Sequence, residues 1–169
     1  MGLFSIFRKK KKTQEEDLNK KFLSIGNKRY DEEDLLTNND LFEFTKKYYE
    51  YEKQVDLSNA DAVHLKVQEF MSELSDLQFT CLNYEEFGEL YNNYKEIPLT
   101  RVAEMGMMEC LVLLTSIQRR NYWNGVSYDV FYGYTKSGLI PKIVERMYNL
   151  YESRMSIHEW WKYSKGNSW

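Results

Sequence analysis

The expected fold depends most on the stretch from Thr100 to Tyr122, which reads TRVAEMGMMECLVLLTSIQRRNY. Its apolar residues recur at helical spacing and cover a wide arc, a pattern typical of a helix enclosed by others. Thr100 is a suitable N-cap, and the Asn124-Gly125 pair that follows is a typical helix terminator. We therefore predict a central helix over residues 101–122, with Leu111 and Leu114 almost fully buried.

Amphipathic patterns on both sides of this stretch predict further helices. The expected ranges are 14–25, 40–54, 59–74, 84–94, 127–136, 141–153 and a last short helix after Ser156. The range 127–136 also has strand propensity, but its helical neighbours favour a helix. We predict an all-α fold, an irregular bundle of about seven or eight helices. It forms a single domain over residues 13–169, preceded by a short basic N-terminal tail over residues 1–12.

Start and stop signals accompany most of these ranges. Side chains that can cap a helix N-terminus are Asn38 or Asn39, Ser58, Asn83, and Ser156, which forms a capping box with Glu159. The acidic run Asp31–Asp34 also suits a helix N-terminus, where the helix dipole favours anions. Gly26-Asn27 is expected to end the first helix, and Gly138 with Pro141 to separate two later ones.

The charge of the chain is unevenly distributed. Five of the 23 basic residues lie in Arg8–Lys12, so the remaining residues hold 18 basic against 26 acidic side chains, a net charge of −8. Nucleic-acid binding needs clustered Lys and Arg on the folded surface, so we expect no nucleic-acid partner. An acidic domain suits a basic protein partner better. No stretch approaches the roughly 18 apolar residues that a membrane-spanning helix needs.

Few residues suggest catalysis or metal binding. His64 follows Asp61 in an Asp-x-x-His pattern, but a second such motif, which a carboxylate-bridged metal pair needs, is absent. His158 is expected to pack beside tryptophans. Cys81 and Cys110 match no metal-binding spacing and are expected to be reduced and buried. We predict no catalytic residue, no metal and no cofactor, and favour a protein that is not an enzyme.

The most unusual local string is Arg119-Arg120-Asn121-Tyr122-Trp123-Asn124-Gly125. Arginines beside aromatic rings can stack on a ligand or bind a carboxylate, although late-helix arginines also complement the helix dipole. The predicted partner-binding residues are Arg119, Arg120, Tyr122, Trp123, Trp160 and Trp161. Further aromatic anchors are expected among Tyr48, Tyr49 and Tyr51. The alternative is an enzyme with a site around Arg119, Arg120 and Asp129.

The N-terminal tail combines an apolar segment with a basic run. Its predicted membrane-contacting residues are Leu3, Phe4, Ile6, Phe7, Arg8, Lys9, Lys10, Lys11 and Lys12. Such a combination can bind weakly and reversibly to an anionic membrane surface. The alternative is a loose tail, or one that folds back and docks Phe4 and Phe7 on the domain.

Residues 114–147 resemble a family of small uncharacterised bacterial helical proteins, a domain of unknown function. The resemblance rests on Leu114–Arg119, Trp123, Gly125, Ser137–Ile140 and Val144–Met147. It implies a helical bacterial protein and supplies no activity.

These observations favour a non-catalytic, protein-binding protein of a bacterial cytoplasm. The most specific hypothesis is an immunity protein that neutralises a basic toxin, since opposite charges steer association and favour the right partner. The alternatives are the enzyme described above and a peripheral scaffold that acts at the inner membrane surface through its tail.

Overall fold

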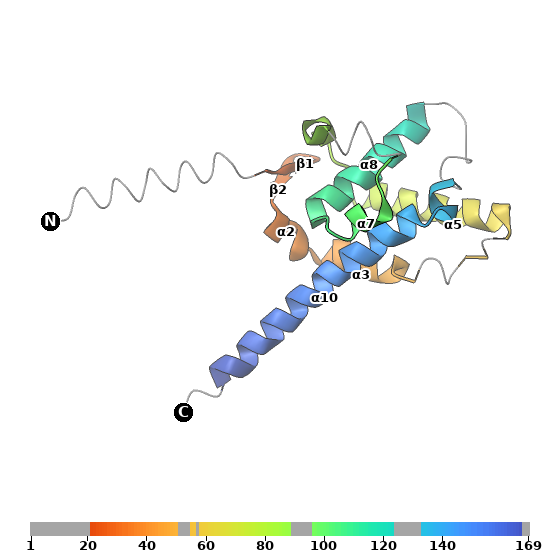
Figure 1. The fold of residues 1–169 in the computed structure, drawn as a ribbon. Coiled ribbons are helices and arrows are strands. Elements are labelled where there is room, and N and C mark those ends of the chain that lie inside the picture. Colours follow the sequence, from red (N-terminus) through yellow and green to blue (C-terminus); the bar gives the residue numbers. More distant parts are fainter. Residues whose placement is uncertain (1–20, 51–54, 57, 89–95, 124–132, 167–169) are drawn as a thin grey trace.

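The computed structural model describes residues 21–50, 55–56, 58–88, 96–123 and 133–166, of which residues 120–123 and 155–166 are described by their backbone alone. The chain is mostly helical, with seven helical segments and one two-stranded sheet among these residues (Figure 1). The elements are β1 (Leu23–Ile25), β2 (Lys28–Tyr30), α2 (Glu32–Leu36), α3 (Asn39–Tyr48), α5 (Ala60–Asp76), the 3-10 helix η1 (Tyr84–Phe87), α7 (Leu99–Val102), α8 (Met107–Trp123) and α10 (Leu139–Gly166). None of the described helices is both long and apolar enough to cross a membrane.

Helix α8 forms the centre of the core, as the sequence predicts. Every residue from Cys110 to Ile117 is fully buried, including Leu111 and Leu114. Burial on all sides of the helix requires neighbours around it, and α8 packs against α2, η1 and α10. Ser116 lies in this apolar environment because its hydroxyl donates to the Val112 carbonyl at 2.8 Å.

The predicted helix over residues 101–122 is wrong in one respect, because the chain breaks between α7 and α8. Thr100 lies inside α7 and does not cap it. The start of α8 is capped by Glu32 from α2, whose carboxylate accepts hydrogen bonds from the backbone N–H groups of Met107 and Met108. Gly106 makes room for this contact, since a Cβ there would lie 2.8 Å from Oε1 of Glu32.

The prediction of an all-α fold is also wrong near the N-terminus. Leu23–Ile25 forms a strand and not the end of a helix, and it pairs antiparallel with Lys28–Tyr30. Gly26-Asn27 makes the two-residue turn between them, with Gly26 at a φ of +57°. Asn83 holds this hairpin: its side chain accepts from the Ser24 N–H at 2.7 Å and donates to the Phe22 carbonyl at 2.9 Å. Asn83 therefore caps no α-helix, and the helix expected over 84–94 begins as the 3-10 turn η1.

Two of the other predicted helix starts are confirmed, and one is wrong by one residue. The run Asp31–Asp34 does begin a helix, with a reciprocal capping box between Asp31 and Asp34. Asn38 caps α3, accepting from the Leu41 N–H at 3.0 Å. The expectation for Ser58 is wrong by one residue, because Asn59 caps α5.

Helix α10 is one continuous element of 28 residues where two helices were predicted. It begins after Gly138, which adopts a φ of +80°. Ser156 lies within it, so the capping box with Glu159 starts no new helix. At 1.5 Å per residue α10 is about 42 Å long. Its first half packs against α2, α3, α7 and α8, whereas its last turns extend beyond the other elements (Figure 1).

Candidate functional site

Two grooves flank the C-terminal turn of α3, and they are the candidate binding surfaces of the described part of the chain. The first, the acidic groove, runs along the outer face of α5 and has a volume of about 540 Å³. Its lining residues are Lys47, Leu65, Gln68, Glu69, Ser72, Glu73 and Asp76. The lining contains three carboxylates and one ammonium group, so the groove is acidic, although Glu69 also pairs at 3.0 Å with Lys66, which is not among the lining residues.

An exposed leucine precedes these carboxylates along α5, with Glu69 one helical turn after it. The stripe of α5 that faces the core contains Val63, Val67 and Phe70, all at most 1% exposed. Leu65 falls outside this stripe and is 58% exposed. An apolar side chain beside a row of carboxylates offers a partner both burial and charge complementarity.

Glu73 ties the groove to α3. Its carboxylate lies 2.5 Å from Nζ of Lys47 and accepts a hydrogen bond from the Tyr48 hydroxyl at 2.7 Å. Burial raises the pKa of the Glu73 carboxyl, but the hydrogen bonds from Lys47 and Tyr48 outweigh it and hold the pKa below its usual value. Burial, supported by the bond to Glu73, raises the pKa of Tyr48. Tyr48 is 1% exposed and so serves the fold, not a partner as the sequence suggested.

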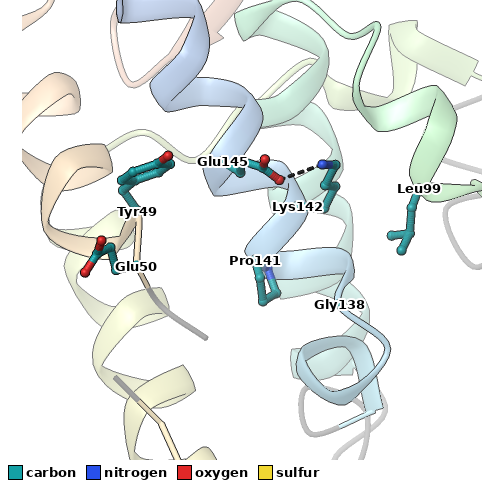
Figure 2. A pocket seen from close by; sticks show the side chains of 7 residues that line it. All are labelled: Tyr49, Glu50, Leu99, Gly138, Pro141, Lys142 and Glu145. Carbon is teal, nitrogen blue, oxygen red and sulfur yellow. Dashed lines mark hydrogen bonds and ion pairs between the residues drawn. The ribbon is translucent and has the colours of Figure 1, made fainter. Parts of the chain in front are cut away.

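The second groove, the tyrosine groove, lies between the end of α3, α7 and the start of α10 (Figure 2). It has a volume of about 370 Å³ and is lined by Tyr49, Glu50, Leu99, Gly138, Pro141, Lys142 and Glu145. Tyr49 and Leu99 are 39% and 41% exposed. Lys142 and Glu145 form an ion pair of 2.6 Å across one turn of α10.

Tyr49, which lines this groove, is one half of a stacked tyrosine pair. The ring of Tyr49 stacks on that of Tyr148, with the centroids 4.0 Å apart and the planes at 19°. The hydroxyl of Tyr148 donates to the Glu152 carboxylate, which raises the pKa of Tyr148. Tyr148 and Glu152, both on α10, thus hold the exposed ring of Tyr49 at the end of α3 in place. Tyr49 is exposed and its role as an aromatic anchor stays a prediction, while Tyr51 lies outside the described residues.

Of the predicted partner-binding residues, only Arg119 has a described side chain. The Arg119 guanidinium lies 4.4 Å from the centroid of the Tyr84 ring, and its Nη1 donates to the Tyr84 hydroxyl at 3.3 Å. It therefore stacks on a ring of its own chain. The side chains of Arg120, Tyr122, Trp123, Trp160 and Trp161 lie outside the described residues, as do Asp129 and the tail residues 1–12.

The two cysteines are buried free thiols. Burial raises the pKa of Cys81 to about 11, against the opposing effects of the Thr115 hydroxyl and the Arg119 charge. Burial likewise raises the pKa of Cys110. Since the thiolate is the nucleophile, neither residue is poised for catalysis at neutral pH. Across the described ranges, no group of three or more His, Cys, Asp or Glu residues could hold a metal ion, and His64 is half-buried on α5.

The sequence contained a signal for one groove but not for the other. Leu65 interrupts the polar face of α5, and this departure from the buried stripe was visible in the periodicity. Leu99 and Tyr49 lie 50 residues apart, and only the packing of α3 and α7 against α10 brings them to one groove.

No protein-family model, curated protein or solved structure matches this chain. The resemblance over residues 114–147 therefore gains no support, and the chain is assigned to no family.

Proposed function

We propose that this protein is a non-catalytic binding protein whose partner is a basic protein. The observation that carries the proposal is the acidic groove, whose lining combines Glu69, Glu73 and Asp76 with the exposed Leu65. A lysine- or arginine-rich partner gains charge complementarity there, and it covers Leu65 when it binds.

Long-range charge supports the same partner. Residues outside Arg8–Lys12 have a net charge of −8, so a basic protein is attracted before contact and associates faster. Screening over about 8 Å at physiological ionic strength weakens this attraction. Binding should therefore be strongest at low salt.

The specific form of the proposal is an immunity protein of the bacterial cytoplasm that neutralises a basic toxin. An inhibitor of this kind needs no chemistry of its own, because occupying the toxin surface is sufficient. Its test is growth: co-expression of the protein with a basic toxin encoded beside it should restore growth, and an Asp76→Lys variant should restore less.

Charge reversal in the groove tests the binding proposal. Asp76 is exposed at the last residue of α5, so Asp76→Lys leaves the core intact and suits the helix dipole. Glu104→Lys is the matched control, since its side chain is 75% exposed, lies away from the groove and gives the same change in net charge. In affinity capture from the native host, the specific partner should be basic. Asp76→Lys should weaken its binding about tenfold, and Glu104→Lys should weaken it much less.

Three results would overturn the proposal. The specific partner could be acidic or a nucleic acid. Its affinity could be the same at low and high salt. The Asp76→Lys and Glu104→Lys variants could bind it equally well.

A further inference from the structure

The tyrosine groove has a chemistry of its own, which the acidic groove does not share. Tyr49 is an exposed aromatic ring whose position is fixed by its stack on Tyr148. A fixed aromatic ring binds a flat cation well, because the cation gains cation–π attraction without first ordering the ring. Figure 2 shows Tyr49 reaching from α3 toward α10, on the side of the groove where Glu145 lies.

The charges of the groove favour a cation over an anion. Its lining includes two carboxylates, Glu50 and Glu145, and one ammonium, Lys142. Lys142 and Glu145 engage each other at 2.6 Å, so the lining has a net charge of −1. Glu152 adds a third carboxylate behind the tyrosine pair through its bond with Tyr148. An anionic ligand would face this excess of negative charge.

Two of the lining residues are apolar. Leu99 from α7 is 41% exposed on the side of the groove opposite Tyr49, and Pro141 lies at the start of α10 between them (Figure 2). A volume of about 370 Å³ is at the lower end of the range for small-ligand pockets, roughly 300–1,000 Å³. It suits a side chain with an apolar stem and a charged end.

We propose that the tyrosine groove binds an arginine side chain of the basic protein partner, with the guanidinium against Tyr49 and Glu145 and the stem along Leu99. This inference rests on the proposed function, since it names the residue type that the partner presents. Arginine fits better than lysine because its planar guanidinium stacks on a ring and donates to a carboxylate at once. A lysine ammonium is a compact and more strongly hydrated charge.

One partner can reach both grooves. Lys47 lines the acidic groove, and Tyr49 and Glu50 line the tyrosine groove. Lys47 and Glu50 are three residues apart, so their Cα atoms lie within about 11 Å of each other and the two linings come close at the end of α3. A basic surface that covers the acidic groove can therefore place an arginine in the tyrosine groove.

Short peptides test the inference on the full-length protein. The probes are acetyl-Gly-Xaa-Gly-amide peptides in which Xaa is arginine, lysine or citrulline, the neutral isostere of arginine. They are titrated into isotopically labelled protein while the backbone amide shifts are followed. We expect arginine to bind more tightly than lysine, and lysine more tightly than citrulline, with the largest shifts at Tyr49, Lys142 and Glu145.

Two variants locate the binding. Tyr49→Ala should weaken arginine binding about two- to fivefold, as expected for an exposed cation–π contact, whereas Tyr49→Phe should retain it. Asp76→Lys, in the other groove, should leave the local contact largely unchanged. The inference is overturned if lysine or citrulline binds as tightly as arginine, if the shifts lie elsewhere, or if Tyr49→Ala has no effect.

The two proposals fail separately. In one outcome, the peptides show no preference for arginine while capture of the partner still depends on Asp76. That outcome overturns the arginine inference and leaves the proposed function standing. Loss of the difference between Asp76→Lys and Glu104→Lys removes the proposed function as well.

Discussion

Replacing Glu32 by alanine should destabilise the protein by about 2 kcal/mol. The Glu32 carboxylate accepts from two backbone N–H groups, those of Met107 and Met108, at the start of α8. Removing it leaves both donors without a carboxylate in a partly buried position. Loss of a helix cap costs about 0.5–2 kcal/mol, and a hydrogen bond to a charged group contributes about 1.5–3 kcal/mol. Water can reach these N–H groups and replace part of the lost hydrogen bonding. The expected loss of stability is therefore about 2 kcal/mol and not the sum of the two ranges.

Urea denaturation and thermal unfolding measure the effect. For a chain of this length, 2 kcal/mol corresponds to a fall in Tm of roughly 4–8 °C. The control is Glu33→Ala, one residue along the same helix. Glu33 is 67% exposed and pairs only with Arg154 on α10 at 2.5 Å among the contacts seen in the described residues. A surface ion pair contributes about 0–1 kcal/mol, so this control should lose less than half as much stability.

Gly106 provides a double-mutant cycle for the same contact. An alanine Cβ at this position would lie 2.8 Å from Oε1 of Glu32, so Gly106→Ala should displace the carboxylate. The same substitution should cost clearly less when Glu32 is already alanine. Equal losses from Glu32→Ala and Glu33→Ala, or additive effects of Glu32→Ala and Gly106→Ala, would refute the capping argument.

Three further predictions concern the core, the acidic groove and the tail. Leu111→Ala should cost about 2–5 kcal/mol in urea denaturation, because Leu111 is fully buried in α8, and a variant as stable as the parent would contradict its place in the core. The pKa of Glu73 is lowered in the folded state, so its contribution to stability is present above about pH 4.3 and is lost as the pH falls through the folded value. The gap between the parent and Glu73→Gln in denaturation midpoint should accordingly close between pH 7 and pH 3, and a constant gap would count against the Lys47 and Tyr48 contacts. In liposome flotation, more of the full chain than of a chain starting at Thr13 should float with anionic vesicles. Equal recovery of the two chains would show that the tail does not bind the membrane.

The core could be predicted from the sequence because burial follows apolar periodicity. Cys110 to Ile117 is apolar on nearly every side, so its central position did not depend on knowing its neighbours. The break before α8 could not be predicted in the same way. It depends on Glu32, 75 residues earlier, and no local signal links the two.

The hairpin was missed because the same residues fit two patterns. Phe22 and Ile25 have helical spacing with Leu18, but Leu23 and Ile25 also alternate as a strand does. The Gly26-Asn27 pair, read as a helix stop, is equally a signal for a two-residue hairpin turn. The contact that favours the strand is distant, since the Asn83 side chain binds the backbone on either side of Leu23.

The boundaries of α10 show the limit of capping signals. Ser156 and Glu159 have the spacing of a capping box, yet the helix continues through both. A capping box stabilises a start only where the preceding residue leaves the helical conformation, and nothing before Ser156 forces this: no proline or glycine lies between Pro141 and Ser156.

The candidate site is best understood through the end of α3 and the turn that follows it. Residues 47–50 read Lys-Tyr-Tyr-Glu, and each has a different surrounding. Lys47 lies in the acidic groove beside Glu73, Tyr48 is buried, and Tyr49 with Glu50 lines the tyrosine groove. Lys47 and Tyr48 end α3, whereas Tyr49 and Glu50 form the turn after it, so four consecutive residues line two surfaces and still contribute to the core.

This arrangement makes the burial of Tyr48 relevant to binding. Tyr48 fixes the rotation of the last turn of α3 through its hydrogen bond to Glu73 and its packing against Phe44 and Phe70. That rotation determines which groove each neighbouring side chain reaches. The aromatic core beneath α3 therefore holds the two grooves in a fixed relation, which a single partner that contacts both would require.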